Sequence, residues 1–164
     1  MKLESGEILV IKDHQKWSEV VMSKTSKTIK IVTMGDSLTQ GGVPPEYRID
    51  NPNLYQSFLF QALKKEGISA AVVNIHTIKP LDTEAILEAA QATGALITVE
   101  EHSIIGGLGG AVAETLSDAG MGIKFRRLGI PDIYAVIGYP EDLYPLYGID
   151  SAGIRTSVLN LLGK

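Results

Sequence analysis

Three consecutive polar residues end one of the most apolar segments of this sequence, where their side chains could move protons. Glu100, Glu101 and His102 follow ALITV, and a carboxylate beside an imidazole can tune a proton-transfer group near neutral pH. Adjacent strand residues point to opposite faces, so at most Glu100 and His102 share one side. In the more common arrangement, one acid and the imidazole instead bind neighbouring loop amides, because polar groups at strand ends are usually hydrogen-bonded scaffold.

A glycine cluster follows, and its backbone amides could bind an anion. Gly106, Gly107, Gly109 and Gly110 lie between a strand pattern and a helix pattern, as in loops that hold phosphate. The cluster lacks the spaced lysine of a P-loop, and a lone glycine motif is a weak indication of phosphate binding. Glycine also permits close backbone approach and packing of the helix on the sheet, which is the interpretation that the sequence favours.

Alternating strands and helices must position these residues. Strand patterns cover residues 28–35, 70–77, 95–101 and 123–130. Helix patterns cover residues 53–67, 81–94, 109–120, 139–148 and 151–162. The alternation predicts a three-layer α/β fold, with a mainly parallel sheet of about five strands and helices on both faces. GEILVIK, residues 6–12, is expected as an antiparallel strand at one edge. The glycine cluster and residues 100–102 then lie at the carboxyl edge of the sheet, where such proteins place ligands.

Composition indicates a single domain that spans residues 1–164. The chain is long enough for an ordinary core, with 45% hydrophobic and 21% charged residues. No apolar run approaches the roughly 18 residues of a membrane span, the N-terminus does not resemble a signal peptide and cysteine is absent, so we expect a cytoplasmic protein without a membrane partner. A net charge of −4 with scattered Lys and Arg argues against nucleic acid as a partner. Zinc-ligand spacing is absent from His14, His76 and His102, so no metal site is expected.

Residues 68–164 resemble the C-terminal domain of transketolase and its thiamine-diphosphate relatives. The resemblance lies in IHTIKPLD, VEEHSIIGGLGGAVAE, RLGIPDIYAVIGYPEDLYPLYGID and SAGIRTSVLNLL, which occur in the order of that family. It implies a flavodoxin-like layering for this part of the chain. Residues 1–27 are then an edge strand and helix, and residues 28–67 a β-loop-α segment in front of the matching core.

In that family thiamine diphosphate is held between two other domains, and the resemblance limits what this chain can do alone. One of those domains supplies a Gly-Asp-Gly…Asn motif for magnesium and diphosphate, which this sequence lacks. The chain alone is therefore expected to bind neither thiamine diphosphate nor magnesium, although the complete enzyme would use both. Because the cofactor performs the carbanion chemistry, no catalytic residue is expected here.

A second resemblance concerns residues 29–65. IVTMGDSLTQGG is similar to the opening block of the GDSL, or SGNH, hydrolases, which implies Ser37 as a nucleophile. In this alternative His102 is the base and Asp36 or Glu100 orients its imidazole, since a serine hydrolase needs both groups. The late Asp-x-x-His of that family is missing, because the residues three positions before the histidines are Ile11, Val73 and Val99. Ser37 is therefore expected to be a turn residue.

The resemblance to transketolase implies a C-terminal domain or split subunit of an enzyme that transfers ketol groups in sugar metabolism, with an assembly or regulatory role. Its partners would be thiamine-binding domains or a thiamine-binding subunit, and a homodimer is expected. The matching family loop lies near a domain or subunit boundary, which implies an interface loop formed by Glu101, His102, Gly106, Gly107, Gly109 and Gly110. Two alternatives remain: an esterase that uses Ser37, and a small-anion-binding module that uses residues 106–110. The chain could also be a recombinant of the two families.

Overall fold

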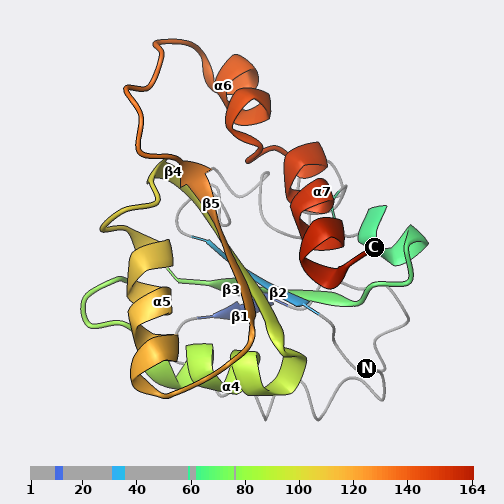
Figure 1. Ribbon diagram of the computed structural model, residues 1–164, viewed down its shortest axis with the longest axis vertical. Coiled ribbons are helices and arrows are strands. Elements are labelled where there is room, and N and C mark those ends of the chain that lie inside the picture. The colour runs from blue at the N-terminus through green and yellow to red at the C-terminus, as the bar shows by residue number, and fades with distance from the viewer. Residues whose placement is uncertain (1–9, 13–30, 36–58, 60–61, 76) are drawn as a thin grey trace.

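The computed structural model describes residues 10–12, 31–35, 59, 62–75 and 77–164 of the 164-residue chain. Its strands form one sheet in the order β1-β3-β2-β4-β5, and every pairing is parallel (Figure 1). The strand bounds are β1 Val10–Lys12, β2 Ile31–Gly35, β3 Ala70–Asn74, β4 Ala95–Ser103 and β5 Lys124–Ile130. The prediction of an α/β fold with parallel strands is confirmed.

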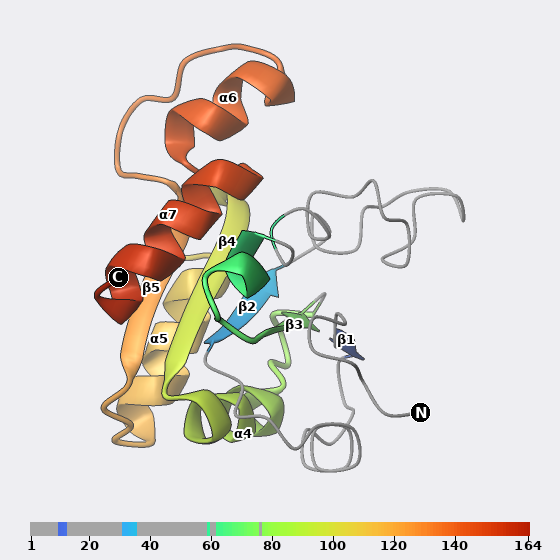
Figure 2. The ribbon, with the colours of Figure 1, turned by 90° about the vertical axis from the view of Figure 1, so that its right-hand side faces the viewer.

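Helices cover both faces of this sheet (Figures 1 and 2). α4, Thr83–Thr93, and α5, Leu108–Asp118, pack on one face with residues of β3 and β4. α7, Ser151–Leu162, packs on the other face with β4 and β5. α6, Pro140–Tyr147, lies beyond the carboxyl ends of β4 and β5, as Figure 1 shows. The chain thus forms three layers, with α6 close to the edge where the polar residues were expected.

Strand β4 divides its side chains between two cores, because alternate residues of a strand point to opposite faces. Leu96 belongs to the core under α4 and α5, together with Val73, Ile86 and Val112. The second core lies under α7 and joins segments that are distant in the sequence, with Leu59, Leu63, Ile97, Leu128, Ile154 and Val158 among its residues. The odd-numbered and even-numbered residues of β4 are therefore fixed on opposite faces along its buried length.

Local signals set the helix ends. The Asp82 carboxylate accepts a hydrogen bond from the Ala85 N–H at 3.0 Å and caps the start of α4, which ends at the left-handed Gly94. Asp150 caps α7 in the same way, accepting from the Gly153 N–H at 2.8 Å. The predicted helices over residues 81–94 and 151–162 are found at nearly these bounds.

The structure corrects the orientation of the first strand. β1 lies at an edge of the sheet, as expected, but it pairs with β3 in parallel, with Val10 opposite Val72. The next strand along the chain, β2, also runs parallel to β3, so residues 13–30 connect two parallel strands and have the dozen or more residues that such a crossover needs. A short alternating strand alone does not reveal its direction. The helix predicted after this strand, within residues 1–27, and the start of the predicted helix at Asn53 lie outside the described residues.

Candidate functional site

The carboxyl end of β4 places the three polar residues in different surroundings. Glu100 is completely buried, whereas Glu101 and His102 are exposed, and the His102 side chain is 52% accessible. The pairing of β4 with β5 is irregular between Val99 and Ser103. Such irregularities redirect side chains at the ends of strands. Glu100 and His102 lie on the same side, as the strand alternation predicts.

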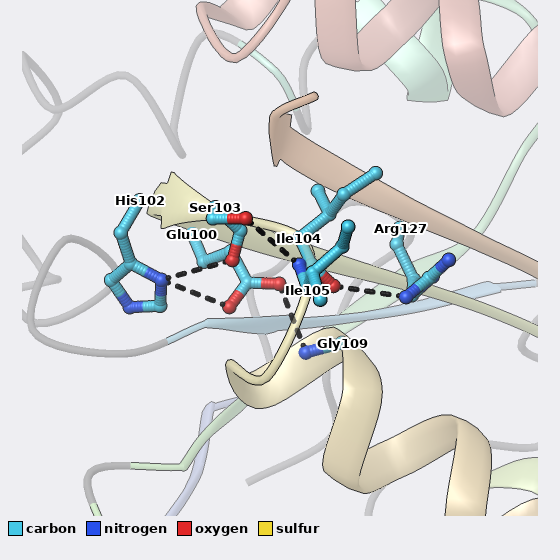
Figure 3. Close-up of polar contacts among 7 residues, drawn as sticks. All are labelled: Glu100, His102, Ser103, Ile104, Ile105, Gly109 and Arg127. Carbon is cyan, nitrogen blue, oxygen red and sulfur yellow. Dashed lines mark hydrogen bonds and ion pairs between the residues drawn. The ribbon is translucent and has the colours of Figure 1, made fainter. Parts of the chain in front are cut away.

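Glu100 joins the end of β4 to the start of α5. Figure 3 shows its carboxylate between the His102 imidazole and the backbone of Gly109. The Gly109 N–H donates to Oε1 at 3.0 Å, and His102 Nδ1 lies 3.3 Å from Oε2. Burial of a carboxylate is costly unless hydrogen bonds and charges compensate it. The positive end of the α5 dipole supplies part of that compensation.

Three glycines make room for this carboxylate. A Cβ atom at Gly107 would lie 2.0 Å from Glu100 Oε2, and one at Gly109 would lie 2.8 Å from Oε1. A Cβ atom at Gly129, on β5, would lie 2.9 Å from Glu100 Cγ. Real Cβ atoms do not approach so closely, so each position needs glycine for space. By contrast, a Cβ at Gly110 would meet no atom within 4 Å, and Gly106 has the left-handed φ of +74° that a tight turn requires.

The group that occupies the start of α5 is therefore a side chain of the protein itself. Glu100 takes the Gly109 amide that a phosphate would use, and its buried carboxyl group fills the space between Gly107 and Gly109. The glycine loop does not fit the diphosphate of thiamine diphosphate. Within the described part of the chain, no three His, Asp or Glu side chains gather closely enough to hold a metal ion.

His102 is the accessible member of the pair. Its Nδ1 atom lies near Glu100 Oε2 and also 3.4 Å from the carbonyl oxygen of Ser103. An Nδ1–H can donate to either oxygen, and the buried carboxylate fixes the imidazole at the carboxyl edge of the sheet. The arrangement resembles the acid and imidazole pair that a hydrolase would need.

The nucleophile of that hydrolase lies outside the described residues, as does Asp36. β2 ends at Gly35 and pairs directly with β4, with Gly35 opposite Val99. The strand that precedes Ser37 in the sequence is therefore a direct neighbour of β4, which carries His102.

Two other contacts at this edge were not predicted from the sequence. The Tyr144 hydroxyl of α6 donates to Glu101, on the opposite side of β4 from Glu100. Arg127 Nη1, from β5, donates at 2.9 Å to the carbonyl oxygen of Ile104, which lies between β4 and the glycine cluster (Figure 3). Neither partner has a local pattern that marks it in the sequence. Gly129 was also missed, although an isolated glycine within a strand pattern is a known sign of close backbone approach.

The part of this chain that contains the candidate site is similar to known proteins. The family model "Transketolase, C-terminal domain" matches residues 59–154. The 1-deoxy-D-xylulose-5-phosphate synthase 1 of Geobacter sulfurreducens is 48% identical over 98 residues, which are 59% of this chain and 15% of that protein. A subunit of the apulose-4-phosphate transketolase of Phocaeicola vulgatus is 44% identical over 110 residues, which are 67% of this chain and 34% of that protein.

A solved structure agrees with these matches. It is a split-gene transketolase in an inactive beta4 tetramer, and it is 30% identical with a TM-score of 0.64. The similarity covers 84% of this chain and 40% of that one. This chain spans only about a third or less of the length of the two curated relatives. With the family model matched over residues 59–154 and the same fold in the split-gene enzyme, the chain belongs to the transketolase C-terminal domain family.

Proposed function

We propose that this chain is the C-terminal domain, or a split C-terminal subunit, of a transketolase-type thiamine-diphosphate enzyme that transfers ketol groups in sugar metabolism. Its role is assembly or regulation, and it has no catalytic activity alone. The relatives that support this proposal include a separate transketolase subunit and a split-gene transketolase. We further propose that the complete domain keeps a mainly parallel five-stranded sheet and acts in the cytoplasm.

The buried Glu100 is the observation that carries the proposal of a non-catalytic role. Its carboxylate fills the start of α5 and is enclosed by Gly107, Gly109 and Gly129. In this proposal the glycine loop is a rigid connection between β4 and α5, and it holds the surface at a domain boundary in a defined position. Thiamine diphosphate and magnesium belong, in this proposal, to the remaining parts of the enzyme, where the cofactor supplies the carbanion chemistry.

The exposed side of the same connection is the proposed contact region. Glu101 and His102 are exposed at the carboxyl edge, and residues 106–110 lie beside them. Polar residues on a rigid element at an interface fix orientation more than they add affinity. The proposed partners are the thiamine-binding domains or subunit of the same enzyme and a second copy of this chain in a homodimer.

Reconstitution tests the proposed function. The chain would be purified alone and together with the thiamine-binding part of a split transketolase, and ketol transfer between sugar phosphates would be measured in each sample. We expect activity only in the combined sample. Calorimetry should detect no binding of thiamine diphosphate and Mg²⁺ to the chain alone. Ketol transfer by the chain alone, or its absence in the combined sample, would contradict the proposal.

The homodimer has its own test. Sedimentation velocity at micromolar concentrations should give the mass of two chains. A monomer at every accessible concentration would refute the homodimer and leave the assignment to a transketolase-type enzyme intact.

A further inference from the structure

The segment between β5 and α6 is an apolar arm that extends from the carboxyl edge of the sheet. We define the arm as residues 131–139, and Figure 1 shows it as the long connection that rises above β4 and β5. Tyr134 and Ile137 have relative accessibilities of 103% and 104%, so they are as exposed as in an extended peptide. The other large apolar side chains of the arm, Ile133, Val136 and Tyr139, are also exposed. Soluble monomers rarely expose contiguous apolar side chains of this size without a function.

Residues of α6 contact the arm, while the large apolar side chains of the arm are exposed to solvent. The Val136 N–H donates to the Tyr147 hydroxyl of α6 at 3.2 Å. Gly138 packs on Leu143, since a Cβ at this glycine would lie 3.1 Å from Leu143 Cδ2. α6 in turn contacts β4 through the Tyr144 hydroxyl and Glu101. These two contacts restrain the arm at Val136 and Gly138 before binding, and restraint of this kind lowers the conformational entropy that a segment loses when it binds.

The charges around the arm indicate what kind of surface it fits. Residues 131–150 contain four acids, Asp132, Glu141, Asp142 and Asp150, and no Lys, Arg or His. Two copies of the arm in contact would bring like charges together, which is unfavourable at an interface. A partner with an apolar centre and a basic rim is complementary in both respects.

The relatives are longer than this chain, and the additional protein that they contain indicates the partner of the arm. The arm lies inside the family match at residues 59–154, and the chain spans 15% and 34% of two curated relatives. The arm therefore belongs to a region that is joined to further protein in those relatives. We propose that the arm docks into an apolar, basic-rimmed surface of the thiamine-binding part of the same enzyme. This inference rests on the function proposed above.

The test uses the full chain and the purified thiamine-binding subunit with which it reconstitutes ketol transfer. Calorimetry would measure the dissociation constant for wild type, Tyr134→Ser and Ile137→Ser. Each substitution should weaken binding at least about tenfold, the effect of removing a central interface side chain. Both positions are fully exposed, so the melting temperature of the free chain should not change. Ile78→Ser, at an exposed position in the turn before α4, is the apolar control and should bind like wild type.

Charge reversal tests the basic rim. Asp132→Lys should weaken binding and reduce its dependence on salt, because it removes an attraction across the interface. Asp118→Lys makes the same charge change at the exposed end of α5 and should have no effect.

Three results would overturn the inference, and they differ from one another. Unchanged binding of Tyr134→Ser and Ile137→Ser, with normal binding of wild type, would exclude the arm and leave the proposed function standing. A wild-type dimer that Ile137→Ser converts to monomer, with subunit binding unchanged, would assign the arm to a second copy. Failure of the wild-type chain to bind the subunit would remove both the proposed function and this inference.

Discussion

Substitution of Gly107 by alanine tests whether the glycine cluster exists to accommodate Glu100. The new Cβ would lie 2.0 Å from Glu100 Oε2 and 2.8 Å from His102 Cε1. Gly107 has an extended backbone, with φ −101° and ψ −158°, so alanine can adopt it and the cost is steric. Overpacking of a core costs about 1–3 kcal/mol, and disturbing a hydrogen bond to a charged group costs about 1.5–3 kcal/mol.

The two contributions overlap, so we expect Gly107→Ala to reduce the free energy of unfolding by about 3 kcal/mol. In a chain of this length that loss lowers the melting temperature by roughly 6–12 °C. Urea denaturation followed by circular dichroism measures the first quantity, and a thermal scan measures the second. Gly110→Ala is the matched control, because it lies in α5 with open space around its Cβ position. That variant should be neutral or more stable by up to about 1 kcal/mol.

A double variant separates the clash with Glu100 from other effects of the substitution. In a Glu100→Ala background the carboxylate is gone, so adding Gly107→Ala should cost less than about 1 kcal/mol. Equal costs of Gly107→Ala in the two backgrounds would refute the reasoning, as would equal effects of Gly107→Ala and Gly110→Ala in the otherwise wild-type chain.

Three further predictions concern single positions. Gly129→Ala places a Cβ 2.8 Å from the backbone oxygen of His102, which cannot rotate away, so it should destabilise by at least about 3 kcal/mol in urea denaturation; a change below about 1 kcal/mol would contradict this. Asp150→Ala removes the cap that accepts from Gly153 and should cost about 1 kcal/mol, measured in the same way; no loss would mean that the cap is dispensable. Ser37 should not react with a fluorophosphonate probe; labelling that His102→Ala abolishes would support the hydrolase.

The elements of this fold could be predicted from the sequence where local chemistry fixes them. Asp82 and Gly94 mark the two ends of α4 by side-chain capping and by a left-handed backbone, and both properties belong to the residue types themselves. The direction of β1 could not be predicted in this way. The sequence of a three-residue strand does not indicate whether the strand is parallel or antiparallel to its neighbour. That direction depends on the route of the connecting chain.

The residue types of the candidate site could be predicted from the sequence, but their spatial arrangement could be predicted only in part. The alternation of a strand places Glu100 and His102 on one side, as found. Which of them is buried depends on α5 and β5, which cover that side. The contacts of Arg127 with Ile104 and of Tyr144 with Glu101 join segments distant in sequence, so no local pattern predicts them.

The neighbours Glu100 and Glu101 secure two different helices from the two sides of one strand. Glu100 holds the start of α5 through Gly109, and Glu101 holds α6 through Tyr144. A shift of one residue in β4 exchanges the faces of all its side chains. A single insertion or deletion between Ala95 and Val99 would therefore detach both helices at once, although it would change neither Glu100 nor Glu101. The length of this strand is under as strict a constraint as its amino acids, and variation in length at this edge should be confined to the segments beyond Ser103.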